Sequence, residues 1–424
     1  MIDTILSALY VLLTGLHVSW LALFFYPSKR SVEHRNLNEG ITILIPAHNE
    51  EKIIQKTIET VLSDDYPGKI EVMVLNDCST DRTSDIVREI AKTDSRVVLY
   101  NMDGHVGKSN AVNFGLKKAR NPIVIILDAD SEIEKNGLSK ITKPFADKMV
   151  GGVSCIMRAR QTKNPLTWFQ DMEYMLASGS RYLFNKVDGT YFLPGFAAFR
   201  KKALEKIGGF SKMTFSEDLD IGLRLKKAGY KLEMSNTAVY TQVPETIRGF
   251  IRQRIRWCVG TVQVIRKHSD LIFNKKYGVV GMYCIPIQIF WYLYSLIYIP
   301  IAFYQIFGGY IQNFAVYKNY LSLEVVRYFF NWFSAYGMVE YVYKTVNGVY
   351  PVTTAFYTLL VMFVLYMTYN LLIMTKFSKP SLRFFITLFF LFPYFFVTLA
   401  LHIVSLIKGT ITPTIAANKW EKAF

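Results

Sequence analysis

The apolar residues of this 424-residue chain are concentrated in two outer regions that flank a more polar inner region. Ile5–Tyr26 is an almost uncharged run, and apolar and aromatic residues dominate again from Val279 onward. The hydrocarbon core of a membrane needs about 20 apolar residues per helix, and Ile5–Tyr26 is long enough to cross it. The inner region, Lys29–His268, has the mixed pattern of a soluble α/β protein.

Further membrane spans are predicted after the inner region. The strong candidates are Val279–Phe303, Thr353–Met374 and Arg383–Ile407. Val325–Tyr343 is a weaker candidate because Arg327 and Glu340 lie inside it, where polar residues would have to face a protein-lined path. Counting this segment gives five spans and omitting it gives four. We favour five.

The charges beside the first apolar run predict its orientation. Lys29, Arg30 and Arg35 follow the run, and basic flanking residues remain in the cytoplasm. A cleaved signal peptide is the alternative, but its basic cluster would precede the apolar run. We therefore predict a multi-pass protein of the cell membrane with a cytoplasmic inner domain. Five spans would leave Lys419–Lys422 in the cytoplasm, and four would leave it outside.

Short β-branched runs alternate with helical patterns in the first half of the inner region. The predicted strands are Gly40–Pro46, Ile70–Leu75, Arg96–Asn101 and Ile123–Leu127, and the predicted helices are Lys52–Ser63, Asp81–Thr93 and Gly107–Lys118. This alternation predicts a Rossmann-like, mostly parallel sheet covered on both faces. Ligands bind such sheets at the carboxyl ends of the strands. That edge would hold Ala47–Glu50, Asp77–Ser79 and Asp128–Asp130.

The second half, Val150–Tyr240, is less regular. Asn164–Phe184 has apolar residues at helical spacing, which favours a core-facing helix over a surface-lying one. Tyr191–Arg200 resembles a strand and turn that return to the ligand edge. Asp218–Gly229 is predicted to be a helix that begins at Asp218.

A helix is also predicted after Pro244. One face carries the apolar residues Ile247, Ile251, Ile255, Cys258, Val262 and Ile265. Gln253, Arg256, Trp257 and Gly260 lie on the opposite face. Because arginines flank the apolar stripe, this pattern is typical of a basic helix at a membrane surface. Its other face would then point into the inner domain; a basic surface helix with an incidental tryptophan is the alternative.

The formal net charge is +16, and 51% of the residues are hydrophobic. Nucleic-acid binding is one interpretation of that charge. The basic residues lie beside membrane segments, however, so anionic lipid head groups and an anionic substrate explain it better. We predict no nucleic-acid partner. The cysteines, Cys78, Cys155, Cys258 and Cys284, have no paired or metal-ligand spacing and are expected to be reduced thiols.

Three motifs at the predicted ligand edge suit a nucleotide and a metal. Asp128 and Asp130 provide the oxygen ligands that Mg²⁺ or Mn²⁺ prefers, although such a pair also occurs in solvated loops. Asp77 can accept the imide N–H of a uracil or bind a ribose hydroxyl, or else serve as a helix N-cap. Lys108, at a helix start, can attract phosphate oxygens or be an exposed lysine. The chain has no G-x-x-x-x-G-K-[ST] loop, which argues against a P-loop nucleotidase.

Asp218 is the candidate general base, because a sugar hydroxyl that attacks an anomeric carbon must lose its proton. Glu217 is predicted to assist it, unless it is only a helix-start acid. Across the site, Arg256 would face a diphosphate leaving group and Trp257 would stack on an acceptor sugar. Gln253 could hydrogen-bond to either.

As an ordered set, these motifs resemble family 2 glycosyltransferases, the membrane synthases of β-linked polysaccharides. They are most similar to bacterial poly-β-1,6-N-acetylglucosamine synthases, with hyaluronan, chitin and cellulose synthases more distant. The matching positions are Pro46–Glu50, Asp77, Gly107-Lys108 with Ala111 and Asn113, Asp128–Asp130, Glu217-Asp218 and Gln253–Trp257. They lie within Ile41–His268 and are not specific for one sugar.

The resemblance implies a GT-A fold, a UDP-sugar donor, Mg²⁺ or Mn²⁺, inversion without a covalent intermediate, and export of the product through the chain's own helices. It assigns uracil to Asp77, nucleotide and metal to Asp128 and Asp130, and the base to Asp218. Gln253, Arg256 and Trp257 would line the acceptor and diphosphate site. Asn76, Cys78 and Ser216 stand where the family often has Asp, Gly and Thr, which bears on nucleotide preference.

Three functions remain open on the sequence. The first is a processive synthase that polymerises UDP-N-acetylglucosamine and translocates the polymer across the bilayer. The alternatives are transfer of a single sugar to a lipid, and a transporter or channel with an inert nucleotide-binding domain. The expected organisation is an anchor (1–28), a GT-A domain (40–242), an interfacial helix (243–275), a region of three or four membrane helices (276–409) and a tail (410–424).

Overall fold

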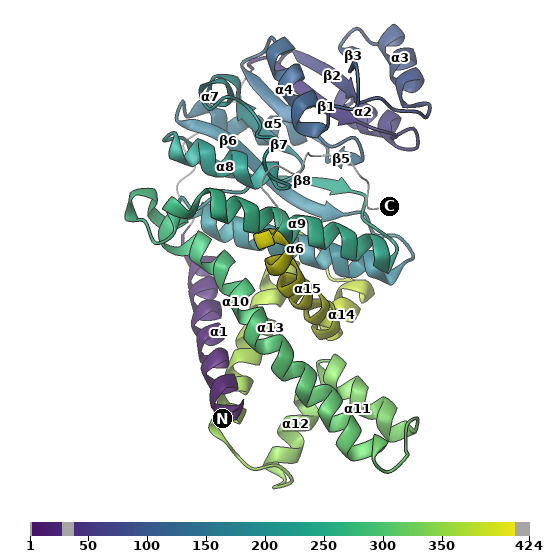
Figure 1. Ribbon diagram of the computed structural model, residues 1–424. Helices are drawn as coiled ribbons and strands as arrows, with labels where there is room; N and C mark the ends of the chain where they lie inside the picture. The colour runs from purple at the N-terminus through teal and green to yellow at the C-terminus, as the bar shows by residue number, and fades with distance from the viewer. Residues whose placement is uncertain (1, 28–37, 412–424) are drawn as a thin grey trace.

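The computed structural model describes residues 2–27 and 38–411. An α/β domain sits above a stem of apolar helices, and α6 (Pro165–Asn185) and α9 (Ile247–Lys267) run between the two (Figure 1). The basic cluster Lys29–Arg35, on which the predicted orientation depends, lies outside the described residues, as does Lys419–Lys422.

One eight-stranded sheet forms the domain, in the order β3-β2-β1-β4-β7-β6-β8-β5. Its strands are β1 (Ile41–Ala47), β2 (Ile70–Asn76), β3 (Val97–Asn101), β4 (Ile123–Ile126), β5 (Ser131–Ile133), β6 (Val150–Ala159), β7 (Ala197–Arg200) and β8 (Lys231–Thr241). β1 pairs in parallel with β2 and β4, and β2 pairs in parallel with β3. The prediction that the first four strands lie parallel to one another is therefore confirmed. β7 runs antiparallel to β4 and β6, so the complete sheet is mixed and mostly parallel.

Helices cover both faces of this sheet, as predicted. They are α2 (Ile54–Leu62), α3 (Thr83–Thr93), α4 (Lys108–Lys118), α5 (Gly137–Thr142), α7 (Lys201–Lys206) and α8 (Glu217–Lys227), together with α6 and α9. Neighbouring strand residues point to opposite faces. Ile43 and Val72 accordingly lie in one buried cluster, and Leu44 and Met73 lie in the other.

The strands of the second half are less predictable from the pattern of residues. The predicted strand Tyr191–Arg200 is shorter in the structure and consists of β7 alone. The long strand β6 is buried along almost all of its length, so it lacks the alternation of polar and apolar residues that marks a strand. Its second and third residues are Gly151 and Gly152, and its pairing with β8 is interrupted by irregularities.

The helix predicted after Pro244 is present as α9. The Oγ1 atom of Thr246 accepts a hydrogen bond from the backbone N–H of Gly249 at 3.1 Å and so caps the first turn. The apolar stripe of α9 is partly covered by protein. A Cβ atom on Gly409 of α15 (Leu391–Ile411) would lie only 2.8 Å from Cβ of Val262, so the two helices are in close contact.

Within residues 2–27 and 38–411, the stem contains four helices that are long and apolar enough to cross a membrane. They are α1 (Ile2–Phe25), the helical segment Val280–Ala315 that includes α10 (Ile285–Phe303), α13 (Thr354–Phe377) and α15. The predicted segment Arg383–Ile407 is divided between α14 (Leu382–Phe389) and α15.

The prediction of a fifth continuous span at Val325–Tyr343 is wrong. This segment forms two helices of 11 residues each, α11 (Leu323–Phe333) and α12 (Tyr336–Val346). Each is about 16 Å long, whereas a hydrocarbon core is about 30 Å thick. The turn between them brings Arg327 Nη2 to 3.3 Å from Glu340 Oε1, so the two charges that weakened the candidate neutralise each other.

Candidate active site

A cavity of about 430 Å³ lies between the ligand edge of the sheet and the helices α6 and α9. Asp130, Asp218 and Trp257, which are far apart in the sequence, all line it. The other predicted site residues that line it are Lys108, Asp128, Glu217, Gln253 and Arg256. The fold therefore brings the predicted residues together in one space, with the exception of Asp77.

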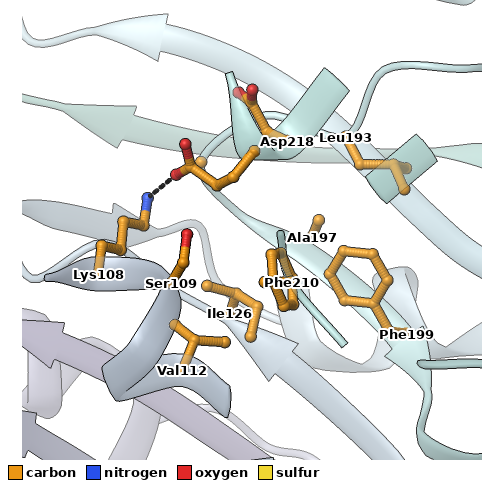
Figure 2. A pocket seen from close by; sticks show the side chains of 11 residues that line it. Lys108, Ser109, Val112, Ile126, Leu193, Ala197, Phe199, Phe210 and Asp218 are labelled. Carbon is orange, nitrogen blue, oxygen red and sulfur yellow. Dashed lines mark ion pairs between the residues drawn. The ribbon is translucent and has the colours of Figure 1, made fainter. Parts of the chain in front are cut away.

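Lys108 lies between the acids on the sheet side of this cavity. Its Nζ atom is 2.6 Å from Asp128 Oδ1 and 3.3 Å from Glu217 Oε1. Burial lowers the pKa of Lys108, but the carboxylates of Asp128 and Glu217 outweigh burial and raise it well above the ordinary value. Figure 2 shows Lys108 and Asp218 above a small pocket with an apolar wall that includes Val112 and Phe199.

Asp218 lies in the first turn of α8, which begins one residue earlier than predicted, and its Oδ1 atom accepts a hydrogen bond from the N–H of Leu219 at 2.9 Å. Burial, and then the neighbouring Glu217 carboxylate, raise the pKa of Asp218 to about 7, although Lys108 acts in the opposite direction. A carboxylate that titrates near neutral pH is well matched to general base catalysis.

The loop before Asp218 is held against α9. The N–H of Phe215 donates to Gln263 Oε1 at 3.2 Å, and the Ser216 hydroxyl donates to the carbonyl oxygen of Trp257 at 3.5 Å. Gly260 makes this approach possible, because a Cβ atom there would lie 2.3 Å from Ser216 Oγ. Gly260 thus lies on the face of α9 that was predicted to point into the domain.

Asp128 and Asp130 follow β4, and the only atoms that their side chains offer to a metal ion are carboxylate oxygens. Asp130 Oδ1 accepts hydrogen bonds from Thr241 Oγ1 at 3.0 Å and Ser131 Oγ at 3.3 Å. Among the described residues no group of three or more histidines, cysteines or acids could hold a metal ion. The two aspartates fit a hard cation such as Mg²⁺ or Mn²⁺ whose remaining ligands come from substrate phosphates and water.

Asp77 has a different environment from the one predicted. Its side chain is fully buried, and its carboxylate oxygens accept hydrogen bonds from the backbone N–H groups of Val106 at 2.7 Å and Gly107 at 2.8 Å. His105 Nδ1 lies 3.1 Å from the same carboxylate. Asp77 therefore supports the turn that leads to Lys108. A direct contact with uracil stays a prediction.

An ionic cluster at the wall of the cavity, formed by Arg254 and the cavity-lining Glu173, was missed on the sequence. Arg254 is 3% exposed, and its Nε atom donates to both carboxylate oxygens of Glu173, at 3.0 and 3.2 Å. Tyr394 of α15 also hydrogen-bonds to Glu173. The Arg254 guanidinium lies 4.3 Å from the ring centroid of Trp257 and supports it. The sequence does hold one signal for this cluster. Glu173 is a charged residue beside Met172 in a largely apolar helix, and a carboxylate in such a place requires a partner.

Three further residues that line the cavity carried no sequence motif. Arg181 of α6, Tyr191 and Gln288 of α10 lie there, and the Tyr191 hydroxyl donates to Gln288 Oε1 at 3.4 Å. Because α10 belongs to a candidate membrane span, this part of the cavity is adjacent to the stem.

Together the mixed sheet and the acids at its ligand edge define a GT-A catalytic domain flanked by candidate membrane helices. Residues 42–208 match the family described as Glycosyl transferase family 2, so the chain carries a domain of that family. The predicted fold class and family resemblance are confirmed.

Curated relatives agree with this assignment. The chain is 32% identical over 250 residues to "Probable glycosyltransferase YdaM" of Bacillus subtilis, covering 56% of this chain and 58% of the relative. It is also 32% identical over 255 residues to "Poly-beta-1,6-N-acetyl-D-glucosamine synthase" of Staphylococcus epidermidis, covering 58% of this chain and 60% of the relative. The chain thus spans less than two thirds of the length of these relatives.

A solved structure shows the same fold. The mannosyltransferase PcManGT from Pyrobaculum calidifontis, solved in complex with GDP-Man and Mn²⁺, superposes with a TM-score of 0.59 at 24% sequence identity. The match covers 85% of this chain and 98% of that one.

Proposed function

We propose that this chain is an inverting glycosyltransferase that uses a UDP-sugar, UDP-N-acetylglucosamine in the first instance, to extend a β-linked polysaccharide. The observation that carries the proposal is the common cavity of Asp130, Asp218 and Trp257. The family 2 domain and the relatives named poly-β-1,6-N-acetylglucosamine synthase support it. The processive reaction and the choice of sugar are part of the proposal.

The sheet side of the cavity would hold the donor. Asp128 and Asp130 would bind Mg²⁺ or Mn²⁺, and the Mn²⁺ in the PcManGT complex supports this choice. When bound, the cation would neutralise charge on the departing diphosphate. Lys108 can exchange its contact with Asp128 for a phosphate oxygen. Arg256 is exposed at the cavity and forms no ion pair with any described residue, so its guanidinium is available to the diphosphate.

The opposite side of the cavity would hold the acceptor. The acceptor hydroxyl attacks the anomeric carbon on the face away from the diphosphate, which forms a new C–O bond as the bond to the diphosphate breaks and inverts the configuration. Asp218 takes the hydroxyl proton, with Glu217 beside it to keep its pKa high. Trp257, supported by Arg254, would stack on the acceptor sugar, and Gln253 would hydrogen-bond to it.

The product would leave along the stem. Gln288 connects the cavity to the membrane segment that contains α10, and four helices of the described chain are long enough to cross a bilayer. We propose a multi-pass arrangement with the catalytic domain (40–242) and the interfacial helix (243–275) on the cytoplasmic side. This route would deliver the polymer to the other side of the membrane.

The test is to incubate the purified chain with labelled UDP-N-acetylglucosamine, UDP-glucose or UDP-glucuronic acid and to determine the size of each product. We expect a polymer from one donor, and digestion with linkage-specific glycosidases will identify its bond. A single-sugar glycolipid without polymer would rule out processive synthesis. If no donor gives UDP release, glycosyl transfer is ruled out and the remaining interpretation is a transporter or channel with an inert nucleotide-binding domain.

A further inference from the structure

Arg181 is a buried cation without a counter-ion. It lies on α6, is 6% exposed, and lines the cavity. Its Nη2 atom donates to Ser178 Oγ at 2.9 Å and to the Cys155 carbonyl oxygen at 3.4 Å, whereas its buried Nε atom has no hydrogen-bond partner. Within the described ranges, no carboxylate forms an ion pair with it.

Two other arginines that contact α6, Arg158 and Arg254, are each neutralised by an acid of that helix. Arg158 Nη2 lies 2.8 Å from Asp171 Oδ2, and Arg254 is bound by Glu173. Removing a charge from water is costly unless an opposite charge and hydrogen bonds compensate. Burial accordingly lowers the pKa of Arg181 to about 10, although Cys155, and then Asp218, act in the opposite direction. An anion beside Arg181 would supply the missing compensation.

The position of Arg181 indicates which molecule brings this anion. Tyr191 and Gln288 line the same cavity, and Gln288 belongs to α10 at the top of the stem. In the proposed function, the donor diphosphate is already served by Lys108, which contacts Asp128, and by the exposed Arg256. A molecule that contacts Gln288 and Arg181 would instead approach Asp218 from the side of the stem, which is the side on which the proposed function places the acceptor.

We propose that Arg181, together with Tyr191 and Gln288, binds an oxyanion carried by the acceptor. Two sources have this chemistry: the phosphate that links a first sugar to a lipid, and the carboxylate of a uronic acid. The guanidinium would form a charge-assisted, bidentate contact, and the amide of Gln288 would donate to the same group. This inference rests on the proposed glycosyl transfer and names the class of its acceptor.

The experiment compares acceptors that share one octyl chain. The full chain in detergent is supplied with UDP-N-acetylglucosamine and Mn²⁺ and one of three acceptors: octyl N-acetylglucosaminide, N-acetylglucosamine 1-(octyl phosphate) or octyl glucuronide. UDP release gives kcat and KM for each. We expect kcat/KM to be at least about tenfold higher for one anionic acceptor than for the neutral one, which corresponds to one modest charged contact. Preference for the phosphodiester identifies a lipid-linked phosphate, and preference for the glucuronide identifies a carboxylate.

Arg181→Gln should remove this preference through KM, and Arg181→Lys should restore part of it. The matched control is Arg120→Gln, the same change at an exposed arginine outside the cavity. If Arg181 only balanced the charge of Asp218, Arg181→Gln would shift the pH profile equally for all acceptors and leave their ratio unchanged, which would overturn the proposal. Equal kcat/KM values for neutral and anionic acceptors in the unmodified chain would overturn it even if Arg181→Gln failed to fold. Absence of UDP release with every acceptor would overturn the proposed transfer itself.

Discussion

The two ends of the cavity differ in how their charges are balanced. At the sheet end, Lys108 is neutralised by Asp128 and Glu217, and Asp130 accepts hydroxyl hydrogen bonds. At the stem end, Arg181 is buried with no carboxylate partner among the described residues. The sheet end can therefore exchange internal contacts for a cation and a diphosphate, whereas the stem end is complete only with an anion. The residues at the stem end, Arg181, Tyr191 and Gln288, belong to none of the motifs found in the sequence.

The largest expected effect comes from Asp218→Asn, which keeps the shape of the sheet end but removes its base. UDP release with acceptor present should fall by about 10²–10⁴-fold, the usual contribution of general base catalysis. Asp65→Asn, the same change at an exposed position, should have no effect. Full turnover in Asp218→Asn would remove the base assignment.

Metal removal tests whether the sheet end depends on a cation as proposed. Treatment with EDTA should lower UDP release at least about 100-fold, since a bound metal ion contributes several kcal/mol to stabilisation of charge in the transition state. Added Mg²⁺ or Mn²⁺ should restore the rate of UDP release. Asp130→Ala should raise the metal concentration that gives half of the maximal rate. An unchanged rate in EDTA would contradict the proposed cation and would leave Lys108 and Arg256 to neutralise the diphosphate without a metal.

Arg254→Met tests the neutralised pair of Arg254 and Glu173 at the wall of the cavity. It leaves Glu173 without its partner and should lower the free energy of unfolding by about 3 kcal/mol, the low end of the range for buried pairs because Glu173 is partly exposed. The midpoint of thermal unfolding in detergent measures this loss. Adding Glu173→Gln to the variant should recover much of it. Arg252→Met, at an exposed neighbour, is the control, and an equal loss there would contradict the pairing.

The pH dependence should show the most gradual effect, about tenfold for each pH unit below the pKa of the base. Asp218 acts as an anion, so kcat/KM should fall as the pH decreases through about 7. Lys108 lowers the pKa of Asp218, and Lys108→Gln should therefore move the midpoint of the profile to higher pH. The measurement is UDP release between pH 5 and 8; a flat profile would exclude Asp218 as the titrating group.

The first half of the domain could be predicted because each short β-branched run ends in a polar motif. This is why the positions of Asp128 and Lys108 at one edge follow from the chain alone. β6 could not be predicted in the same way, since burial of both faces removes the alternation. The hairpin of α11 and α12 was missed because hydropathy does not show that Arg327 and Glu340 pair across a turn.

The site was predictable where a motif is local and unpredictable where helices from different parts of the chain meet. Asp218 and Trp257 belong to motifs, and both line the cavity. The pairing of Arg254 with Glu173 exists only because α6 and α9 lie together, and Arg181 reaches the cavity for the same kind of reason. The sequence did not reveal that the Asp77 carboxylate, predicted to bind uracil, accepts hydrogen bonds from the backbone N–H groups of Val106 and Gly107.

An experimental structure of the chain with UDP and Mn²⁺ would test the central claim most directly. The account predicts that Mn²⁺ binds to Asp128 and Asp130 and that the diphosphate lies within reach of Lys108 and Arg256. The space between it and Asp218 should be open toward Trp257. UDP bound outside this cavity, with Asp218 remote from the diphosphate, would contradict the account.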